Sequence, residues 1–382
     1  MPEFNPTPDE RPCERVAVVG AGLAGLSCAR ALAEAGCSVE LFDKSRGVGG
    51  RMATRRSDWR DGEGAPVEIA FDHGVSGFVA RSPAFVLAVE DAHRQGWLAR
   101  WEPSVAPGSR ALFDAAPDAA AWVCVPDMPA WCRQLQADLP LHRAQAVECL
   151  QRDAGGWRLS VAGAAHAAGH EAAFDAVVLA MPPAQAAALL LPHRPDWAEH
   201  ARQVTMQPCW TLMGLTDAEA DLPDWHVSRP HSGALDWVIR HDRKPGRSAP
   251  RGQAAWVLHA SVAWTEAHLQ ADVDSARAAL QDELARLLGR PLTWRHAVTH
   301  CWLYARPAGH PTNGTNPLAH WDASLGLGVC GDFLGPACGD EMAALGVERA
   351  WMSGHGLGRQ MAQSLRSGAK PVAPLALGGE PT

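Results

Sequence analysis

A glycine-rich turn between a short apolar run and a helical pattern constrains this chain more than any other feature. Residues 15–19 are apolar after the first, and Gly20-Ala-Gly-Leu-Ala-Gly25 follows at once. From Leu23 to Ala35 the apolar residues recur at helical spacing, and residues 38–42 predict a second strand. Three glycines at this spacing, between a strand and a helix, are typical of a βαβ unit that binds a dinucleotide.

Each glycine has its own physical task in such a unit. Gly20 makes the tight turn, Gly22 lets the backbone approach a pyrophosphate, and Gly25 lets the helix pack on the sheet. The helix N-terminus then stabilises the phosphates through its unpaired N–H groups and its positive dipole end. Asp43 stands at the end of the second strand, where its carboxylate can accept both ribose hydroxyls.

A second glycine cluster, Arg46-Gly-Val-Gly-Gly-Arg51, follows directly. A long dinucleotide needs its second phosphate held beyond the first helix. Gly49 and Gly50 permit close backbone approach and Arg51 can pair with phosphate, which favours FAD over NAD. A solvated basic loop is the alternative. Far downstream, Asp332 follows an apolar run and either accepts a ribityl hydroxyl or only ends a turn.

The remaining patterns predict an α/β chain of two or three domains, as its 382 residues allow. Four half-exposed strands, 209–215, 234–240, 253–262 and 292–304, indicate an antiparallel sheet. Helices are expected at 83–96, 128–139, 274–288 and 347–365. We expect residues 14–75, 140–183 and 305–366 to form a cofactor domain and residues 76–139 and 184–304 a substrate domain. Residues 1–13 and 367–382 read as flexible ends.

Charge and composition narrow the partners. The formal net charge is −8 and basic runs are short, which argues against nucleic acid and anionic membranes and favours a small-molecule substrate. No stretch reads as a membrane span or a signal peptide. The scattered cysteines lack a C-x-x-C pair and predict reduced thiols in the cytoplasm. His166 and His170 lack suitable neighbours, so no metal is expected. We expect a monomer or homodimer.

Residues 16–52, Phe71-Asp-His-Gly74, Trp302-Leu-Tyr-Ala-Arg-Pro307, Gly331-Asp332 and Trp351-Met-Ser-Gly354 together resemble the FAD-dependent amine-oxidase superfamily, and most of all its bacterial renalase branch. The resemblance implies a Rossmann-type FAD domain with an interleaved antiparallel substrate domain, as in p-hydroxybenzoate hydroxylase. It further implies noncovalent FAD and hydride transfer from dihydronicotinamide isomers of NAD(P)H to flavin N5, with oxygen reduced to hydrogen peroxide. Leu23, Ala24, Lys44, Val147 and Val347 are then additional cofactor-binding residues.

Two rival functions stay open. Amine oxidases of this superfamily usually carry a lysine near flavin N5, and this chain has only Lys44, Lys244 and Lys370. Lys244 lies in a polar loop, so we expect none of the three to be buried there, which weighs against an amine oxidase or desaturase. Val75-Ser-Gly77 stands where the renalase pattern has Ala-Gln-Tyr, so a flavin-binding protein without turnover is the other rival.

The candidate catalytic residues are His73, Trp302 and Tyr304. His73 follows a strand and either hydrogen-bonds flavin or substrate or caps a turn. Even-numbered residues from Trp294 to Tyr304 are expected on one strand face, with Trp302 and Tyr304 either walling the flavin or packing in the core. His259 is more typical of a core histidine than of a pocket residue. Beyond the insertion 335–342, Val347 is expected at a helix start, where N–H groups approach the flavin.

Overall fold

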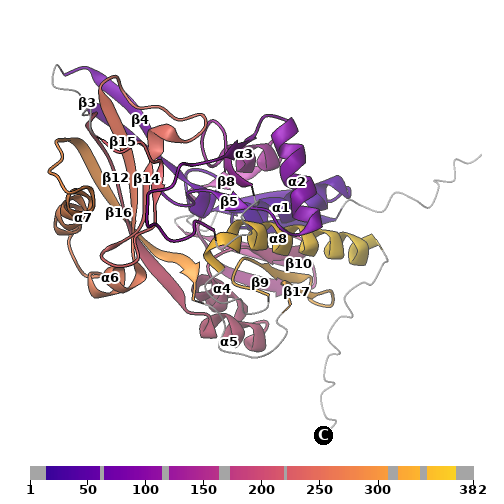
Figure 1. Cartoon of the computed structure of the whole chain (residues 1–382). Helices are drawn as coiled ribbons and strands as arrows, with labels where there is room; N and C mark the ends of the chain where they lie inside the picture. The colour runs from indigo at the N-terminus through magenta and orange to yellow at the C-terminus, as the bar shows by residue number, and fades with distance from the viewer. Residues whose placement is uncertain are drawn as a thin grey trace, which may run out of the picture.

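Figure 1 shows the computed structural model, which describes residues 14–60, 64–113, 120–162, 173–218, 222–308, 317–335 and 342–366. The expected end segments 1–13 and 367–382, the histidines at 166 and 170 and most of the insertion 335–342 lie outside these ranges. Within them, two β-sheets lie in separate lobes, each with helices on it. The expected α/β class is confirmed.

The first lobe is built on a six-stranded sheet in the order β17-β18-β11-β1-β2-β8. Its strands are β1 (Arg15–Val19), β2 (Ser38–Asp43), β8 (Leu141–Arg143), β11 (Ala176–Leu179), β17 (Ala319–Asp322) and β18 (Leu327–Cys330). All neighbours pair in parallel except β17, which lies antiparallel at one edge. The central strands are buried on both faces, which is why they read as continuous apolar runs.

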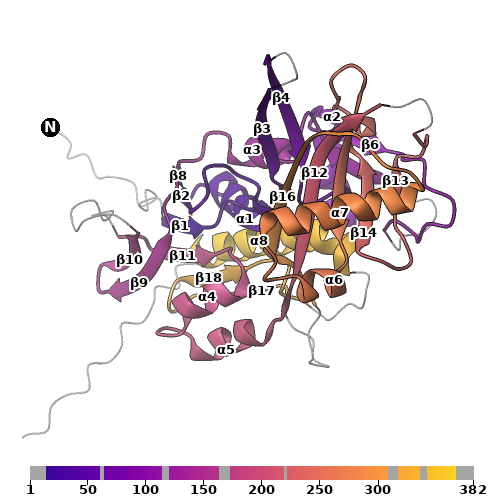
Figure 2. The same ribbon diagram turned by 90° about the vertical axis from the view of Figure 1, so that its left-hand side faces the viewer.

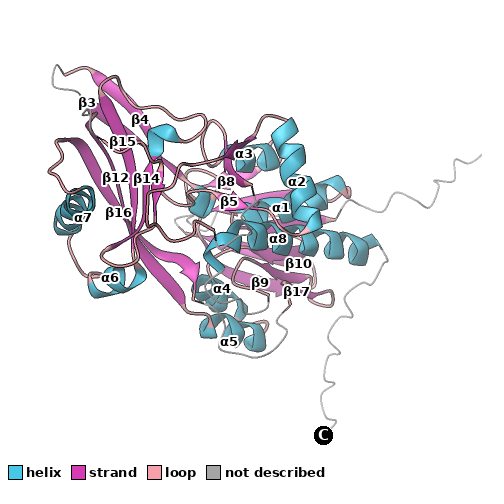
Figure 3. Ribbon diagram, viewed as in Figure 1, coloured by secondary structure: helices cyan, strands magenta, loops and turns pink. Residues whose placement is uncertain are grey.

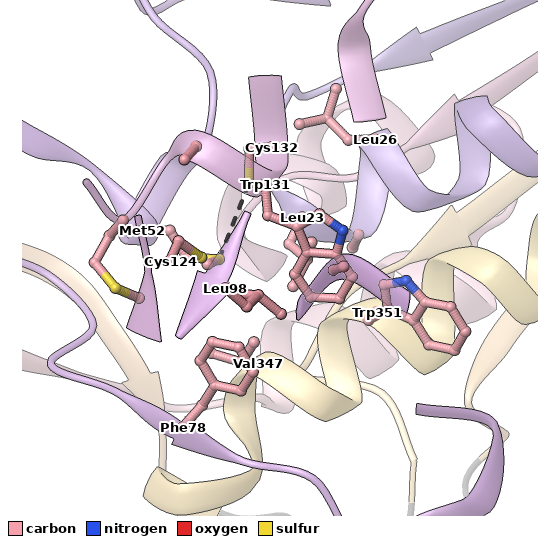
Figure 4. Packing of buried hydrophobic residues seen from close by; sticks show 14 of the residues in the cluster. Leu23, Leu26, Met52, Phe78, Leu98, Cys124, Trp131, Cys132, Val347 and Trp351 are labelled. Carbon is pink, nitrogen blue, oxygen red and sulfur yellow. Dashed lines mark hydrogen bonds between the residues drawn. The ribbon is translucent and has the colours of Figure 1, made fainter. Parts of the chain in front are cut away.

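Helix α1 (Leu23–Glu34) packs against α8 (Met342–Arg366), although the two are distant in the sequence. Gly354 makes this approach possible, because a Cβ there would lie 1.9 Å from the carbonyl oxygen of Ala24. Leu23, Trp131, Val347 and Trp351 belong to the buried apolar core at this contact, part of which Figure 4 shows. Gly354 and Gly358, which weaken α8 as a sequence pattern, therefore serve its packing on α1.

The second lobe is a five-stranded antiparallel sheet in the order β13-β14-β15-β12-β16. Its strands are β12 (Met206–Asp217), β13 (Val227–Ser228), β14 (Leu235–Arg240), β15 (Gln253–Ala260) and β16 (Trp294–Pro307). Helix α7 (Val273–Leu288) packs on the outer face of this sheet (Figure 2), and α6 (Val262–Ala267) follows β15. The sequence predicts the four longer strands, which β13 joins. Its expectation that they are half-exposed is wrong for β12, β14 and β15, which are mostly buried on both faces.

One expectation about β16 is wrong. A register shift between Leu215 and Thr216 of the partner strand places an irregularity near Arg295, and Trp294 consequently packs with the outer core rather than on the face of Val298. A Cβ at Gly214 would lie 2.6 Å from the Trp294 ring, which confirms that this indole turns to the outer face. Simple alternation therefore fails at the first position of the strand.

Smaller elements complete the two lobes (Figure 3). They are the hairpin β3 (Thr54–Arg60) and β4 (Pro66–Asp72), the sheet β5 (Phe78–Val79), β7 (Ala121–Cys124) and β6 (Leu98–Trp101), the hairpin β9 (Val147–Asp153) and β10 (Gly156–Val161), the 3-10 turns η1 (Gly50–Met52) and η2 (His241–Arg243), and the helices α2 (Pro83–Arg94), α3 (Ala130–Gln136), α4 (Pro183–Leu190) and α5 (Pro195–Gln203). The sequence predicts α2 and β9–β10, overestimates α3, and misses β3, α4 and α5.

Helix α8 begins at Met342, five residues before the predicted start. Val347 thus lies inside the helix and not at its first turn, so its backbone N–H is not one of the free groups of a helix start. No disulfide joins the eight cysteines in the described ranges. None of the helices that the structure describes is long and apolar enough to span a bilayer.

Candidate active site

A cavity of about 1520 Å³ runs between the two lobes. It begins at Gly20 and Asp43 on the parallel sheet, passes Arg51, and ends against Trp237 and Trp302 of the antiparallel sheet. Pockets for drug-sized ligands are typically about 300–1,000 Å³. The size of this cavity therefore suits an extended ligand with room for a second molecule.

The first glycine cluster forms the turn that the sequence predicts. Gly20 has φ +115°, and a Cβ there would lie 2.1 Å from the carbonyl oxygen of Ala180. At Gly25 a Cβ would lie 1.9 Å from the carbonyl oxygen of Gly20, so this glycine lets α1 close on the turn. A Cβ at Gly22 meets no atom within 4 Å and Gly22 lines the cavity. Space is therefore kept at Gly22 for a ligand and not for protein packing.

Gly22 is also the N-cap of α1, and no side chain caps it. The first N–H groups of the helix are therefore available to an anion, as a phosphate requires. Leu23 and Ala24 line the cavity here, as does Val147 of β9.

Asp43 ends β2 and lines the cavity. Its Oδ2 accepts the Ala21 N–H at 2.6 Å and its Oδ1 accepts the Ser45 N–H at 2.7 Å. These bonds fix the carboxylate beside the glycine turn, where the sequence places the ribose. Lys44 also lines the cavity, and its Nζ donates to Gln185 at 3.2 Å.

The second glycine cluster is joined to the first. The Gly49 N–H donates to the carbonyl of Ala21 at 2.9 Å, and a Cβ at Gly50 would lie 3.5 Å from the Cα of Gly22. Gly49 and Gly50 have φ of +107° and +55°, a region that side chains disfavour. The two motifs thus form one continuous wall, as an elongated dinucleotide requires.

Arg51 and Asp332 pair with each other. Two parallel hydrogen bonds of 2.6 Å join the guanidinium to the carboxylate, a geometry that fixes both groups. Burial opposes the charge of Arg51, but the Asp332 carboxylate raises its pKa. The sequence predicts separate contacts of these residues with the cofactor, and the structure shows that they form one cavity-lining unit.

His73 lies beside this unit on the loop after β4. Gly74 lets the loop approach closely, because a Cβ there would lie 1.9 Å from the Arg51 carbonyl oxygen. The His73 ring stacks on Trp302 at 4.9 Å, and the Trp302 indole N–H donates to the His73 carbonyl at 3.0 Å. Burial, aided by His300, lowers the pKa of His73 to about 4. His73 is therefore a neutral imidazole on the cavity wall.

A row of side chains continues the wall across the antiparallel sheet. Trp237 pairs with His259, His259 with Thr211, and Thr211 with His300. Directly paired residues point to the same face, and all four line the cavity. Trp302 and Tyr304 of β16 line it too. Alternation along β16 predicts that His300 and Trp302 share a face. It does not predict that His259 and Thr211 lie beside them, because alternation within one strand does not reveal which strands are neighbours.

Asp236 is the carboxylate nearest this row in the sequence, and it is already neutralised. It pairs with Arg110, with Arg229 at 3.1 Å and with Arg306 at 3.6 Å. Burial opposes ionisation, but the arginines, Arg229 foremost, lower the pKa of Asp236 below its usual range. Asp236 and Arg306 line the cavity. Arg306 lies in the motif Trp302-Leu-Tyr-Ala-Arg-Pro307, but the sequence assigns neither Asp236 nor Arg306 a role in the site.

The polar sequence around Lys244 does not reveal that this side chain is buried. Lys244 is 3% exposed, and its Nζ lies 2.9 Å from Asp72. Arg247 and His241 hold the same carboxylate at 2.6 and 3.3 Å. Neither Lys244 nor Asp72 lines the cavity. Lys244 therefore serves an ion cluster outside the cavity lining. Among the described residues, no three His, Cys, Asp or Glu side chains are grouped to hold a metal.

Comparisons with known proteins agree with this geometry. Residues 18–89 match the NAD(P)-binding Rossmann-like domain, and residues 123–356, more than half of the chain, match the flavin-containing amine oxidoreductase family. An L-amino-acid oxidase from Crotalus adamanteus is 44% identical over 63 residues, which are 16% of this chain and 12% of the oxidase. A zeta-carotene desaturase from Synechocystis is 44% identical over 55 residues, 14% of this chain and 10% of that protein. These alignments cover only a small part of either relative.

Solved structures share the fold over most of the chain. A putative protoporphyrinogen oxidase from Exiguobacterium has a TM-score of 0.65 at 14% identity, covering 93% of this chain and 99% of its own. Cyclohexylamine oxidase from Brevibacterium oxydans has a TM-score of 0.63 at 12% identity, covering 93% and 100%. The cavity residues fit FAD, since an uncapped helix start, ligand space at Gly22 and the joined glycine walls suit its pyrophosphate. The chain therefore belongs to the flavin-containing amine oxidoreductases and is an FAD-dependent oxidoreductase.

Proposed function

We propose that the protein is a renalase-like oxidase that converts dihydronicotinamide isomers of NAD(P)H to NAD(P)+. The observation that carries the proposal is the charge at the antiparallel end of the cavity. Asp236, the cavity-lining carboxylate of the antiparallel sheet, is paired with arginines, and so is Asp332, which follows β18 of the parallel sheet. A cationic amine would find no free counter-ion on this part of the wall, whereas a neutral ring needs none.

Other wall residues support the same substrate class. Trp237, Trp302 and Tyr304 offer aromatic faces for a flat ring. Arg306 lines the cavity and is 34% exposed at its side chain, so it is available to the phosphates of a dinucleotide. His73 and His259 are neutral, with pKa values of about 4 that result chiefly from burial.

In this proposal residues 14–75, 140–183 and 305–366 hold FAD, and residues 76–139 and 184–304 bind the substrate. Gly20, Gly22, Gly25, Asp43, Gly49 and Gly50 hold the nucleotide part, and Arg51, Asp332, His73 and Trp302 surround the part that reacts. When bound, FAD supplies two-electron oxidation. The net reaction takes a dihydronicotinamide, a proton and oxygen to the nicotinamide cation and hydrogen peroxide. Aromatisation of the ring drives it, so the protein needs to orient the ring rather than supply a strong acid or base.

Steady-state turnover tests the proposal. The purified yellow protein is mixed in air with isomeric NAD(P)H, and separately with putrescine and cyclohexylamine, while peroxide and NAD(P)+ are measured. We expect both products from the dihydronicotinamides and little peroxide from the amines. Peroxide from amines alone would replace the proposal by an amine oxidase. No peroxide from either class would favour a flavin-binding protein without turnover. We further propose a cytoplasmic monomer or homodimer, as expected from the sequence.

A further inference from the structure

The inner face of the antiparallel sheet changes from apolar to polar where the cavity begins. Met213, Val257, Ile239 and Val298 of the four main strands belong to the core that fills the space between the lobes. The next residue on the same face of each strand, toward the cavity, lines the cavity. These residues are Thr211, His259, Trp237 and His300. Thr211, His259 and His300 therefore bring polar side chains onto this face where it lines the cavity.

His259 sits in the middle of this row, between Trp237 and Thr211. Its Nε2 is buried and has no hydrogen-bond partner among the described residues. A buried nitrogen without a partner costs free energy, and such atoms are uncommon in folded proteins. His73, whose ring contacts His300 and Trp302, likewise has a buried Nδ1 without a described partner. The cavity wall thus carries two unused hydrogen-bonding atoms.

The second nitrogen of His259 determines what Nε2 can do. The His259 ring lies near the backbone of His73, which favours a protonated ring. We assign the single N–H of the neutral ring to the nitrogen at this contact. A neutral imidazole carries one N–H, so Nε2 keeps its lone pair and is an acceptor. Burial keeps the ring neutral, with a pKa of about 4.

The surrounding charges select the kind of donor that Nε2 can accept. Asp236 favours protonation of His259 and Lys244 disfavours it, but burial outweighs both and lowers the pKa of His259. Asp236 is also tied to Arg110, Arg229 and Arg306. An ammonium group beside His259 would be desolvated without a free carboxylate. A neutral N–H, as on an amide, avoids this cost.

We propose that His259 accepts a hydrogen bond from the carboxamide N–H of a nicotinamide-type ring seated against the Trp237–His259–Thr211–His300 row. The inference deepens the proposed function and rests on it for the substrate class. It makes His259 the residue that selects a carboxamide, while Trp237 and Trp302 provide aromatic contact for the ring. His259 donates no proton to the reaction and is a specificity residue.

Binding to the oxidised holoprotein tests the inference without turnover. Nicotinamide and 3-acetylpyridine have similar rings, but only nicotinamide carries an amide N–H. Each is titrated into the yellow protein, and Kd is obtained from the change in flavin absorbance. We expect nicotinamide to bind about five to ten times more tightly than 3-acetylpyridine, the effect of one neutral hydrogen bond.

Three variants sharpen the test. His259→Leu should bind both ligands equally, and His259→Gln, which retains an acceptor, should recover part of the preference. His320→Leu is the matched control, because His320 is a half-buried neutral histidine on β17, outside the cavity lining. The control should keep the full preference, and all variants should remain yellow.

Equal binding of the two ligands by the unaltered protein, or no binding of either, would overturn the inference. It is also overturned if His259→Leu still prefers nicotinamide to 3-acetylpyridine. A variant that changes the flavin spectrum but not ligand binding would overturn it too, because His259 would then contact the flavin and not the ligand. These outcomes are independent of the turnover assay. If dihydronicotinamides reduce the flavin but His259 has no effect on binding, only the inference fails. If the protein oxidises amines and not dihydronicotinamides, the proposed function fails.

Discussion

The space beside Gly22 is free of protein atoms, and this indicates that Gly22 makes room for a ligand. Gly20 and Gly25 are required by atoms of the protein that a Cβ would strike, but a Cβ at Gly22 would point into space that belongs to the cavity. Substitution at Gly22 should consequently affect the ligand far more than the fold.

Gly22→Val should therefore purify folded but without flavin, because the branched side chain fills the pyrophosphate space. The absorbance of the purified variant, compared with its thermal unfolding, checks this. Gly356→Val is the matched control, since Gly356 is exposed on α8 and a Cβ there meets nothing within 4 Å. A fully yellow Gly22→Val protein would show that the turn does not bind phosphate.

Arg306 should distinguish a dinucleotide from a bare ring. Arg306→Ala is expected to lower kcat/KM for isomeric NAD(P)H about tenfold, roughly the effect of one charge-assisted hydrogen bond. It should leave an N-benzyl dihydronicotinamide, which has no phosphate, nearly unchanged. An equal loss of kcat/KM for the two substrates would instead indicate that Arg306 only positions Asp236 in the cavity wall.

The sequence predicts the role of a residue when the residues that define this role are its neighbours in the chain. It does not predict roles that depend on partners far away in the chain. The turn glycines and Asp43 are recognised because spacing and strand context carry the information. The burial of Lys244 could not be predicted because its partner, Asp72, lies on β4, 172 positions away in the sequence. Asp236 escaped notice for the same reason, since Arg110 and Arg306 reach it from other segments.

At the level of elements, the α1–α8 contact determines whether the closing helix can lie on the cofactor domain. Two glycines of α8 differ only in the side they face. Gly354 is pressed against the backbone of α1, whereas Gly356 is exposed. Helix propensity alone would make alanine stabilising at both positions.

Gly354→Ala should lower the free energy of unfolding by about 2 kcal/mol or more, because its Cβ overlaps the Ala24 carbonyl and separates the helices. Gly356→Ala should instead raise it by up to about 1 kcal/mol. Urea unfolding of both variants provides the comparison. Stabilisation by both substitutions would contradict the close packing of α1 and α8.

Asp72 joins β4 to the turn that follows β14, through Lys244, Arg247 and His241. Burial opposes ionisation, but Lys244 and the other cations hold the pKa of Asp72 well below its usual range. The unfolded carboxyl titrates near about 3.9. Its stabilising contribution is thus present above that pH and is lost as the pH falls toward the folded pKa.

Asp72→Asn should cost about 3–5 kcal/mol at pH 7, because it leaves buried cations without their counter-ion. Asp91→Asn removes an exposed pair with Arg94 and should change stability by less than about 0.5 kcal/mol. Thermal unfolding at pH 7 compares them. A near-neutral Asp72→Asn would mean that the cluster does not hold the elements together.

At the scale of the whole molecule, the cavity exists because two sheets of different kinds meet. The parallel sheet offers the carboxyl ends of β1 and β2, where ligands bind in such folds. The antiparallel sheet contributes residues of its inner face, among them Trp302 and His259, to the opposite wall of the cavity. The α/β class and most strands of both sheets follow from periodicity. The hairpin β3–β4 and the register irregularity in β16 do not, because both depend on contacts between distant strands.

The absorbance of the flavin during anaerobic mixing tests the central claim most directly. The purified protein should be yellow, and isomeric NAD(P)H should bleach the flavin while NAD(P)+ forms in equal amount. Putrescine and cyclohexylamine should leave the spectrum unchanged. A colourless protein that takes up no FAD, or a flavin that amines bleach and dihydronicotinamides do not, would contradict the account.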